Sequence, residues 1–509
     1  MLDLVVDGRV ISFVERGQTL LDVLAGAGID SVKDGCSPQG QCGCCTVLVD
    51  GQARVACVTP ARRVKGRAIT TVDGLDPERR QAWGDAFCAT GGSQCGFCTP
   101  GIVVRLDALD RKGVLAPAAV DQALLAHLCR CTGWQTIREA AQHFAEGAEA
   151  VGRDLAAAAR RAEIEGRAPQ RVDPEVAFGR GGFAVDTAPH DALVAVPAED
   201  GSWVVADTID EARASAGKVQ GRRTTMDPTW PLELPDHAGF AAALRTTWTE
   251  PAYLETDASW CEPGGEPADP IANGGAFGAK QSSAVPAIAR RLADEHGQTV
   301  LALASREFTV RQGPKRPPVA GWANADGTGV IRVVRTPGLR EVIGSVAPDL
   351  VVEERMVHGP PTSLDVRAAG WAEALVLLAG AAGRAGPITS PDGAVAEATV
   401  DDEGITVSVR CGEVLDDVVL RSYCIGAAHM AWSWLTSEAL AVDEAGEIHD
   451  LTVRSFGVLR AVDTPPITVE IIPEDRPAVN GSDAVFAAVA AAGWVRSGCR
   501  QDWPVGPIA

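Results

Sequence analysis

Eight cysteines within the first 131 residues fall into two groups with the spacing of metal ligands. The first group comprises a C-x5-C-x2-C run and one further cysteine on the segment that follows it: Cys36, Cys42, Cys45 and Cys57. The second joins the C-x2-C pair of QCGFCTPG to the C-x-C pair of HLCRCTGW: Cys95, Cys98, Cys129 and Cys131. Four thiolates at one site suit a structural zinc ion or an iron–sulfur cluster, because soft sulfur ligands select these metals.

The chain around the first group favours a cluster over zinc. A tight loop before a β-hairpin, with the fourth ligand on that hairpin, is the plant-type ferredoxin arrangement for a [2Fe–2S] cluster. The spacing there is C-x4-C-x2-C, so one residue is extra here and predicts an enlarged loop over the cluster, at the edge where electrons would leave. Cys44 and Cys45 are adjacent and therefore awkward joint ligands, so Cys57 supplies the fourth thiolate better than Cys44 does.

The second group lies among signals for helix starts. Thr99 and Pro100 directly follow Cys98, and Thr132 follows Cys131 in a similar way. Free N–H groups and the positive end of the helix dipole stabilise thiolates, so we expect both pairs at helix N-termini. Buried structural cysteines or a zinc site are the alternative for either group.

The elements that must position these cysteines predict an α+β protein of several domains. Residues 1–76 are β-rich, with strand–turn–strand patterns at two Asp-Gly turns and one short helix capped by Thr19. Residues 77–155 show helical periodicity in four short segments. Residues 156–175 are charged and alanine-rich and predict a linker, helical or disordered. Residues 176–509 mix strands and helices and are rich in glycine and proline.

Composition excludes several classes of function. The chain has 509 residues, with 46 Lys and Arg against 67 Asp and Glu, and the net charge of -21 argues against nucleic-acid or acidic-membrane partners. No stretch predicts a membrane span, and the N-terminus lacks the pattern of a signal peptide, so we expect a cytoplasmic protein. In that reducing compartment fourteen cysteines indicate metal or redox sites rather than disulfides.

The motifs QCGFCTPG and LCRCTGW, preceded by CGCCTVLVDG, resemble the iron–sulfur portion of the xanthine dehydrogenase/aldehyde oxidase family of molybdenum hydroxylases. This resemblance covers roughly residues 1 to 150. It implies a β-grasp [2Fe–2S] ferredoxin domain, and then a four-helix [2Fe–2S] domain whose cluster lies nearest the molybdopterin. It implies that the first cysteine group holds the outer cluster, that the second holds the inner cluster, and that Gln94 hydrogen-bonds the pterin. Cys44, where the family has Ala or Ser, and His127, where it has Asn, depart from the pattern without removing a ligand.

Residues 176–509 are similar to part of the family's molybdopterin subunit. The segments are EPAYLETDASW, ANGGAFGAK, SREFTVRQGPKRPP and DGTGVIRVV, with RAAGWAEA around Arg367 as a fainter match. The resemblance implies that Gly274, Gly275, Phe277 and Gly278 line the cofactor, since glycines let the backbone come close to a bulky ligand. The region is therefore expected to be an abbreviated molybdopterin-binding-like domain, because it is far shorter than the full subunit.

The general-base glutamate of the family has no counterpart in this sequence. The segment VEIIPEDRPAVNGSDAVFAAVAAAG resembles the helix that follows the glutamate's GVGE loop, but the loop itself is missing. Four acids lie nearby and are interpreted as solvated carboxylates: Glu470, Glu474, Asp475 and Asp483. The catalytic residues are left unassigned.

These observations predict the iron–sulfur electron-transfer subunit of a heteromeric molybdenum hydroxylase. Electrons would pass from a molybdopterin centre through two [2Fe–2S] clusters to a flavin or another acceptor. The expected partners are a large molybdopterin-binding subunit and a flavin subunit that carries FAD, with molybdopterin cytosine dinucleotide bound by this chain or by its partner. Two alternatives are a self-contained hydroxylase acting on aldehydes or N-heterocycles, and a non-enzymatic redox adaptor or scaffold.

Overall fold

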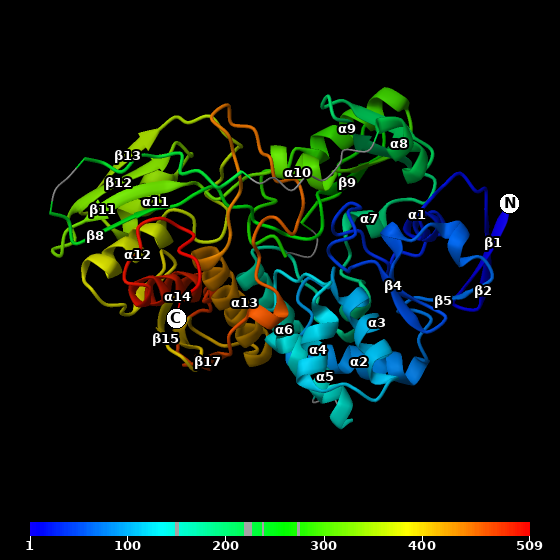
Figure 1. The fold of residues 1–509 in the computed structure, drawn as a ribbon, viewed down its shortest axis with the longest axis horizontal. Helices are drawn as coiled ribbons and strands as arrows, with labels where there is room; N and C mark the ends of the chain where they lie inside the picture. Colours follow the sequence, from blue (N-terminus) through cyan, green and yellow to red (C-terminus); the bar gives the residue numbers. More distant parts are fainter. Residues whose placement is uncertain (148–151, 218–225, 237–238, 272–274, 509) are drawn as a thin grey trace.

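The first 70 residues form a ferredoxin-like sheet with the strand order β2-β1-β5-β3-β4. The structure is a computed structural model, which describes residues 1–147, 152–217, 226–236, 239–271 and 275–508. The sheet carries one helix, α1 (Leu20–Gly26), which begins with a capping box at Thr19, and it lies at one end of the molecule (Figure 1). Its strands are β1 (Leu2–Val6), β2 (Arg9–Phe13), β3 (Thr46–Val49), β4 (Gln52–Val55) and β5 (Ala68–Thr70).

Four helices follow, as the periodicity predicts: α2 (Pro77–Thr90), α3 (Thr99–Asp110), α4 (Pro117–Leu124) and α5 (Gln135–Glu146). Trp83 of α2 stacks on Phe144 of α5 with ring centroids 3.7 Å apart, which fixes these two helices side by side. Two short 3-10 turns, η1 (Ala56–Val58) and η2 (Ala61–Val64), lie between β4 and β5, and a third, η3 (Pro174–Phe178), follows later in the chain.

The segment expected to be a linker contains the packed helix α6 (Leu155–Gly166). Asp154 caps its N-terminus by accepting hydrogen bonds from two backbone N–H groups. Arg161 and Glu165 of this charged, alanine-rich segment are fully buried against the C-terminal half of the chain. Since these two charged side chains lie in the core, this helix is part of the folded body.

Three four-stranded sheets build the rest of the chain, in the orders β7-β6-β10-β9, β13-β12-β11-β8 and β14-β15-β16-β17. Their strands are β6 (Leu193–Pro197), β7 (Trp203–Ala206), β8 (Ala242–Arg245), β9 (Ala258–Cys261), β10 (Val300–Leu303), β11 (Val319–Ala323), β12 (Gly329–Val334), β13 (Leu350–Arg355), β14 (Ile388–Thr389), β15 (Val395–Val400), β16 (Ile405–Arg410) and β17 (Ile467–Ile471). The helices are α7 (Ala184–Thr187), α8 (Ile209–Ala216), α9 (Val285–His296), α10 (Arg306–Gln312), α11 (Leu339–Val346), α12 (Trp371–Ala381), α13 (Asp417–Thr436) and α14 (Ser482–Arg496), with η4 (Ala461–Asp463).

Helix α13 lies near the centre of the molecule in Figure 1, α14 packs beside it, and both are buried along most of their length. Small residues let neighbouring helices approach closely: a Cβ at Gly380 of α12 would lie 2.2 Å from the Trp494 ring of α14. Helix α13 also reaches the N-terminal helices, since Ser422 donates a hydrogen bond to the Gly91 carbonyl. The predicted α+β multidomain fold class is confirmed. None of the helices in the described residues is long and apolar enough to cross a membrane.

Candidate iron–sulfur sites

The sulfurs of the first cysteine group lie together in the core. Cys36 is hydrogen-bonded to Cys42 and Cys57, Cys57 is also bonded to Cys45, and all four side chains are buried. The fold explains this: β3 starts directly after Cys45, and the chain turns into η1 after β4, which brings Cys57 back to the loop. Hydrogen bonds from the Cys42 and Cys57 thiols lower the pKa of Cys36 to about 2, so the group stabilises a thiolate.

The second group forms a similar set. Cys129 is hydrogen-bonded to Cys98 and Cys131, and the Cys131 and Cys95 sulfurs are 3.6 Å apart. Hydrogen bonds from the Cys131 and Cys98 thiols lower the pKa of Cys129 well below its usual range. Cys98 itself is the N-cap of α3, which begins at Thr99, whereas α5 begins only at Gln135. Only the first pair therefore lies directly at a helix N-terminus.

The donor set of each group fits a [2Fe–2S] cluster, for which four cysteine thiolates are the ligands. All fourteen cysteines are free of disulfides. Within the described residues, no set of three or more His, Cys, Asp or Glu side chains is placed to hold a metal ion. The fit therefore rests on four sulfur donors gathered at each place, and on the thiolate that each group stabilises.

The two groups are joined through their backbones. The carbonyl of Cys42 accepts a hydrogen bond of 3.0 Å from the N–H of Leu128, the residue before Cys129. His127, also buried, lies 3.2 Å from the Thr46 hydroxyl, and burial lowers its pKa to about 3. One covalent and hydrogen-bonded path thus runs directly from a cysteine of one group to a cysteine of the other.

The glycine-rich loop lies against the second group. Gly274 falls outside the described residues, but Gly275 has φ +82° and a Cβ there would lie 2.9 Å from the Cys95 sulfur. At Gly278, φ is +94° and a Cβ would lie 1.8 Å from the Asp365 carbonyl oxygen. The Phe277 ring lies under the Arg367 guanidinium, 4.0 Å from centroid to carbon. The loop therefore needs glycine at both described positions to approach its neighbours.

A pterin does not fit beside Gln94 in this structure. The Gln94 amide nitrogen donates to the Cys131 carbonyl and to the Ser422 hydroxyl, both at 2.9 Å, and its oxygen is buried without a partner. The adjoining cavity, lined also by Tyr423, measures about 20 Å³, which is room for a single water. The cavity lined by Phe277 and Arg367 has the same size. Helix α13 thus fills the space next to Gln94.

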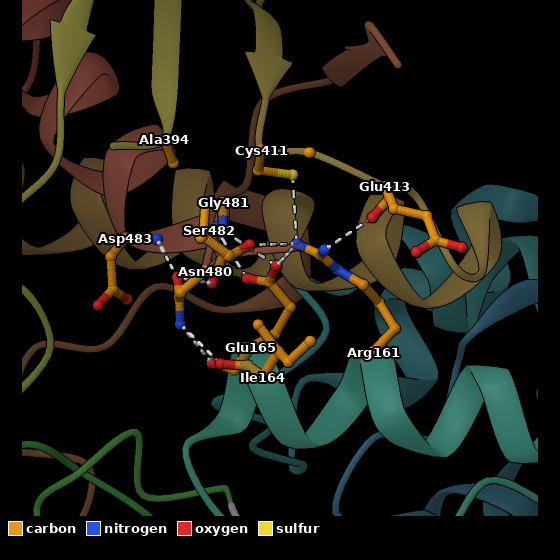
Figure 2. A network of polar contacts seen from close by, with 12 residues as sticks. Arg161, Ile164, Glu165, Ala394, Cys411, Glu413, Asn480, Gly481, Ser482 and Asp483 are labelled. Carbon is orange, nitrogen blue, oxygen red and sulfur yellow. Dashed lines mark hydrogen bonds and ion pairs between the residues drawn. The ribbon is translucent and has the colours of Figure 1, made fainter. Parts of the chain in front are cut away.

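The start of α14 carries a carboxylate that sequence reasoning missed (Figure 2). Glu165 of α6 accepts hydrogen bonds from the N–H groups of Gly481 and Ser482, at 3.0 and 2.8 Å, and pairs with Arg161. Because its carboxylate is engaged by these three donors, Glu165 caps the N-terminus of α14. No pattern in the sequence indicated this capping role, because Glu165 lies in the segment expected to be a linker.

The four acids considered near this point differ in their surroundings. Asp483 is 3% exposed and pairs with Arg367 and Arg167, so its interpretation as a solvated carboxylate is wrong: both guanidinium groups compensate its burial. Glu474 is half-buried and paired with Arg476. Glu470 and Asp475 are exposed.

Paired cysteine groups on a ferredoxin-like sheet and a helical domain define an iron–sulfur protein. Residues 71–142 match the family model of the [2Fe-2S] binding domain. The chain is 38% identical over 125 residues to the xanthine dehydrogenase iron-sulfur-binding subunit of Escherichia coli O157:H7, covering 24% of this chain and 78% of that protein. It is 41% identical over 103 residues to a probable xanthine dehydrogenase subunit of Bacillus subtilis, covering 20% of this chain and only 60% of that protein.

The remaining chain has a structural relative. The fold resembles the aldehyde oxidoreductase from Desulfovibrio gigas with a TM-score of 0.70 and 15% identity, covering 97% of both chains. At that identity the likeness shows a shared fold. The chain belongs to the xanthine dehydrogenase/aldehyde oxidase family of molybdenum hydroxylases, a family of oxidoreductases.

Proposed function

We propose that this chain is the iron–sulfur electron-transfer subunit of a heteromeric molybdenum hydroxylase. In this proposal the second cysteine group holds the inner cluster and the first group holds the outer cluster. The clusters supply one-electron redox chemistry, while the protein sets their distance and surroundings. The observation that carries the proposal is the contact between the groups, in which Leu128 bonds the carbonyl of Cys42.

A partner chain supplies the molybdopterin cytosine dinucleotide, and a flavin subunit supplies FAD where a flavin is the acceptor. Two features of this chain support that division. The cavities beside Gln94 and Phe277 each hold about one water, so neither of these two places has room for a pterin among the described residues. The carboxylate at the start of α14, Glu165, is committed to backbone donors and to Arg161.

A self-contained hydroxylase is the second candidate, because the fold likeness to an aldehyde oxidoreductase extends over 97% of both chains. This candidate requires the space beside Gln94 to open, with α13 moving away from the N-terminal helices. The two candidates differ in what the purified chain contains, and metal analysis separates them.

Metal analysis and electron paramagnetic resonance of the purified chain test the proposal. We expect about four iron atoms per chain, two distinct [2Fe–2S] signals after reduction and no molybdenum. Cys131→Ser should remove one signal and about half of the iron, because that group loses a ligand. Cys88→Ser, on α2 and outside both groups, is the matched control and should keep both signals. Stoichiometric molybdenum with hydroxylase activity in the absence of partners would establish the second candidate.

A further inference from the structure

A cavity of about 530 Å³ lies against the first cysteine group. Cys57 and the enlarged loop, with Pro38 and Gln41, form one wall. The opposite wall consists of α8 and the ends of β6 and β10, which contribute Ala214 and Leu303. Helix α8 lies beside the ferredoxin-like part, close to α1 (Figure 1). This volume is in the range of small-molecule sites.

The charges of the lining exclude an anionic ligand. Two arginines and four acids line the cavity: Arg16, Arg213, Asp22, Asp210, Glu211 and Glu307. Both arginines are already paired with acids. Arg16 bonds Glu211, and Arg213 bonds Asp22 and Asp34 at 3.2 and 2.6 Å. Neither guanidinium is therefore free to bind a phosphate, and the surplus of carboxylates repels nucleotides.

The uncharged part of the lining suits an apolar ligand with a few polar oxygens. Pro38, Val58, Val196, Pro197 and Leu303 give apolar surface on both walls. Ser37 and Gln41 add a hydroxyl and an amide on the wall that carries Cys57. Ligand sites of this kind combine an apolar lining with a few polar groups that orient the ligand.

We propose that this cavity binds a neutral quinone-type electron acceptor next to the outer cluster. The inference rests on the proposed function, because it needs an electron-carrying cluster at Cys57. One electron from each of the two reduced clusters, together with two protons from solvent, converts the quinone to its hydroquinone. Both clusters return to their oxidised state, so electrons and protons balance.

Binding is measured by equilibrium dialysis of the oxidised full-length chain with menadione, and in parallel with FMN. Ala214→Trp places a large side chain in the cavity and should weaken menadione binding at least about tenfold. Ser215→Trp, at the neighbouring exposed position outside the lining, is the matched control and should bind as the wild type does. In photoreduced samples, menadione should reoxidise both clusters more slowly in Ala214→Trp than in Ser215→Trp, as measured by the decay of their resonance signals.

Three results overturn the proposal: no menadione binding, equal binding by the two tryptophan variants, or tighter binding of FMN than of menadione. Iron content and both resonance signals are measured on the same samples. Intact clusters without quinone binding overturn only the acceptor site. Missing clusters overturn the proposed function, whereas the dialysis, which needs no cluster, still decides whether the cavity binds a quinone.

Discussion

A Cβ atom at Gly101 would lie 2.4 Å from the carbonyl oxygen of Gly43. It would also lie 2.6 Å from the carbonyl oxygen of Cys44. Gly101 belongs to the first turn of α3, directly after the Cys98 cap, and Gly43 lies in the loop of the first cysteine group. No side chain fits between the two segments, so the absence of a Cβ is what lets the two cysteine groups approach.

Replacing Gly101 with alanine should separate these segments. The clash is with backbone oxygens, which cannot rotate away, so we expect a loss of about 1–3 kcal/mol in the free energy of unfolding. Magnetic interaction between the two reduced clusters should weaken as well. Gly26→Ala on α1 is the control, because nothing lies within 4 Å of its Cβ position. Equal urea midpoints for the two variants would contradict a tight contact at Gly101.

Cys44 should tune the outer cluster without holding it. Its side chain is fully buried and shares a hydrogen bond with the sulfur of the expected ligand Cys42, in which Cys44 is the donor once Cys42 is a thiolate ligand. Hydrogen bonds to ligand sulfurs raise the potential of an iron–sulfur cluster. Cys44→Ala should keep both resonance signals. It should lower the reduction potential of the outer cluster by roughly 20–45 mV, which corresponds to the loss of a hydrogen bond that contributes about 0.5–1 kcal/mol.

Cys44→Ser separates the hydrogen bond from the sulfur itself. Serine keeps an O–H donor. The reduction potential of the outer cluster in Cys44→Ser should therefore lie closer to the wild-type value than the potential in Cys44→Ala does. Redox titration followed by resonance measures both variants. If either substitution removes a cluster signal, Cys44 is a ligand and the assignment of the loop is wrong.

The run in the first cysteine group and each pair of the second could be predicted from the sequence because they depend on short spacings along the chain, whereas the pairs of the second group meet across α3 and α4. A tight turn or a helix start brings such residues together within one or two elements, whatever the rest of the chain does. The four helices of residues 77–146 were predictable for the same reason, since their periodicity is local. The fold class followed from the elements, although their packing did not.

The role of α6 could not be predicted, because its charged residues are satisfied by partners far away in the sequence. Arg161 donates to the Val479 carbonyl, and Glu165 accepts from Gly481 and Ser482. The sequence shows only a charged, alanine-rich stretch, which is typical of a solvated linker. The contact of Gln94 with Ser422 of α13 was hidden in the same way, so the filled space beside the second cysteine group was not foreseen.

Removing the Glu165 carboxylate should destabilise the junction of α6 and α14. Glu165→Ala leaves the Arg161 guanidinium buried without its ion partner and leaves two N–H groups at the start of α14 unsatisfied. Breaking a buried pair in this way costs about 3–5 kcal/mol. Urea unfolding of the two proteins measures the loss. Glu163→Ala, on the exposed face of the same helix, is the control and should change stability by less than about 0.5 kcal/mol.

His429 should make stability depend on pH. It is fully buried on α13, and a Cβ at Gly133, in the turn after Cys131, would lie 3.1 Å from its own Cβ. Burial lowers its pKa from 6.5 to about 4. Between these two values the unfolded chain binds the proton and the folded chain does not. The stabilising contribution of neutral His429 is therefore complete above about pH 7 and is lost as pH falls from about 6.5 towards 4.

The variant His429→Gln cannot titrate and isolates this effect. Both proteins share the same carboxylates, whose contributions cancel in the difference between them. On going from about pH 7.5 to about pH 5, the wild type should lose about 2 kcal/mol more in its free energy of unfolding than the variant loses. Urea unfolding at both pH values gives this difference. Parallel losses in the two proteins would mean that the folded state accommodates a protonated imidazole, and that α13 is less tightly enclosed than its burial indicates.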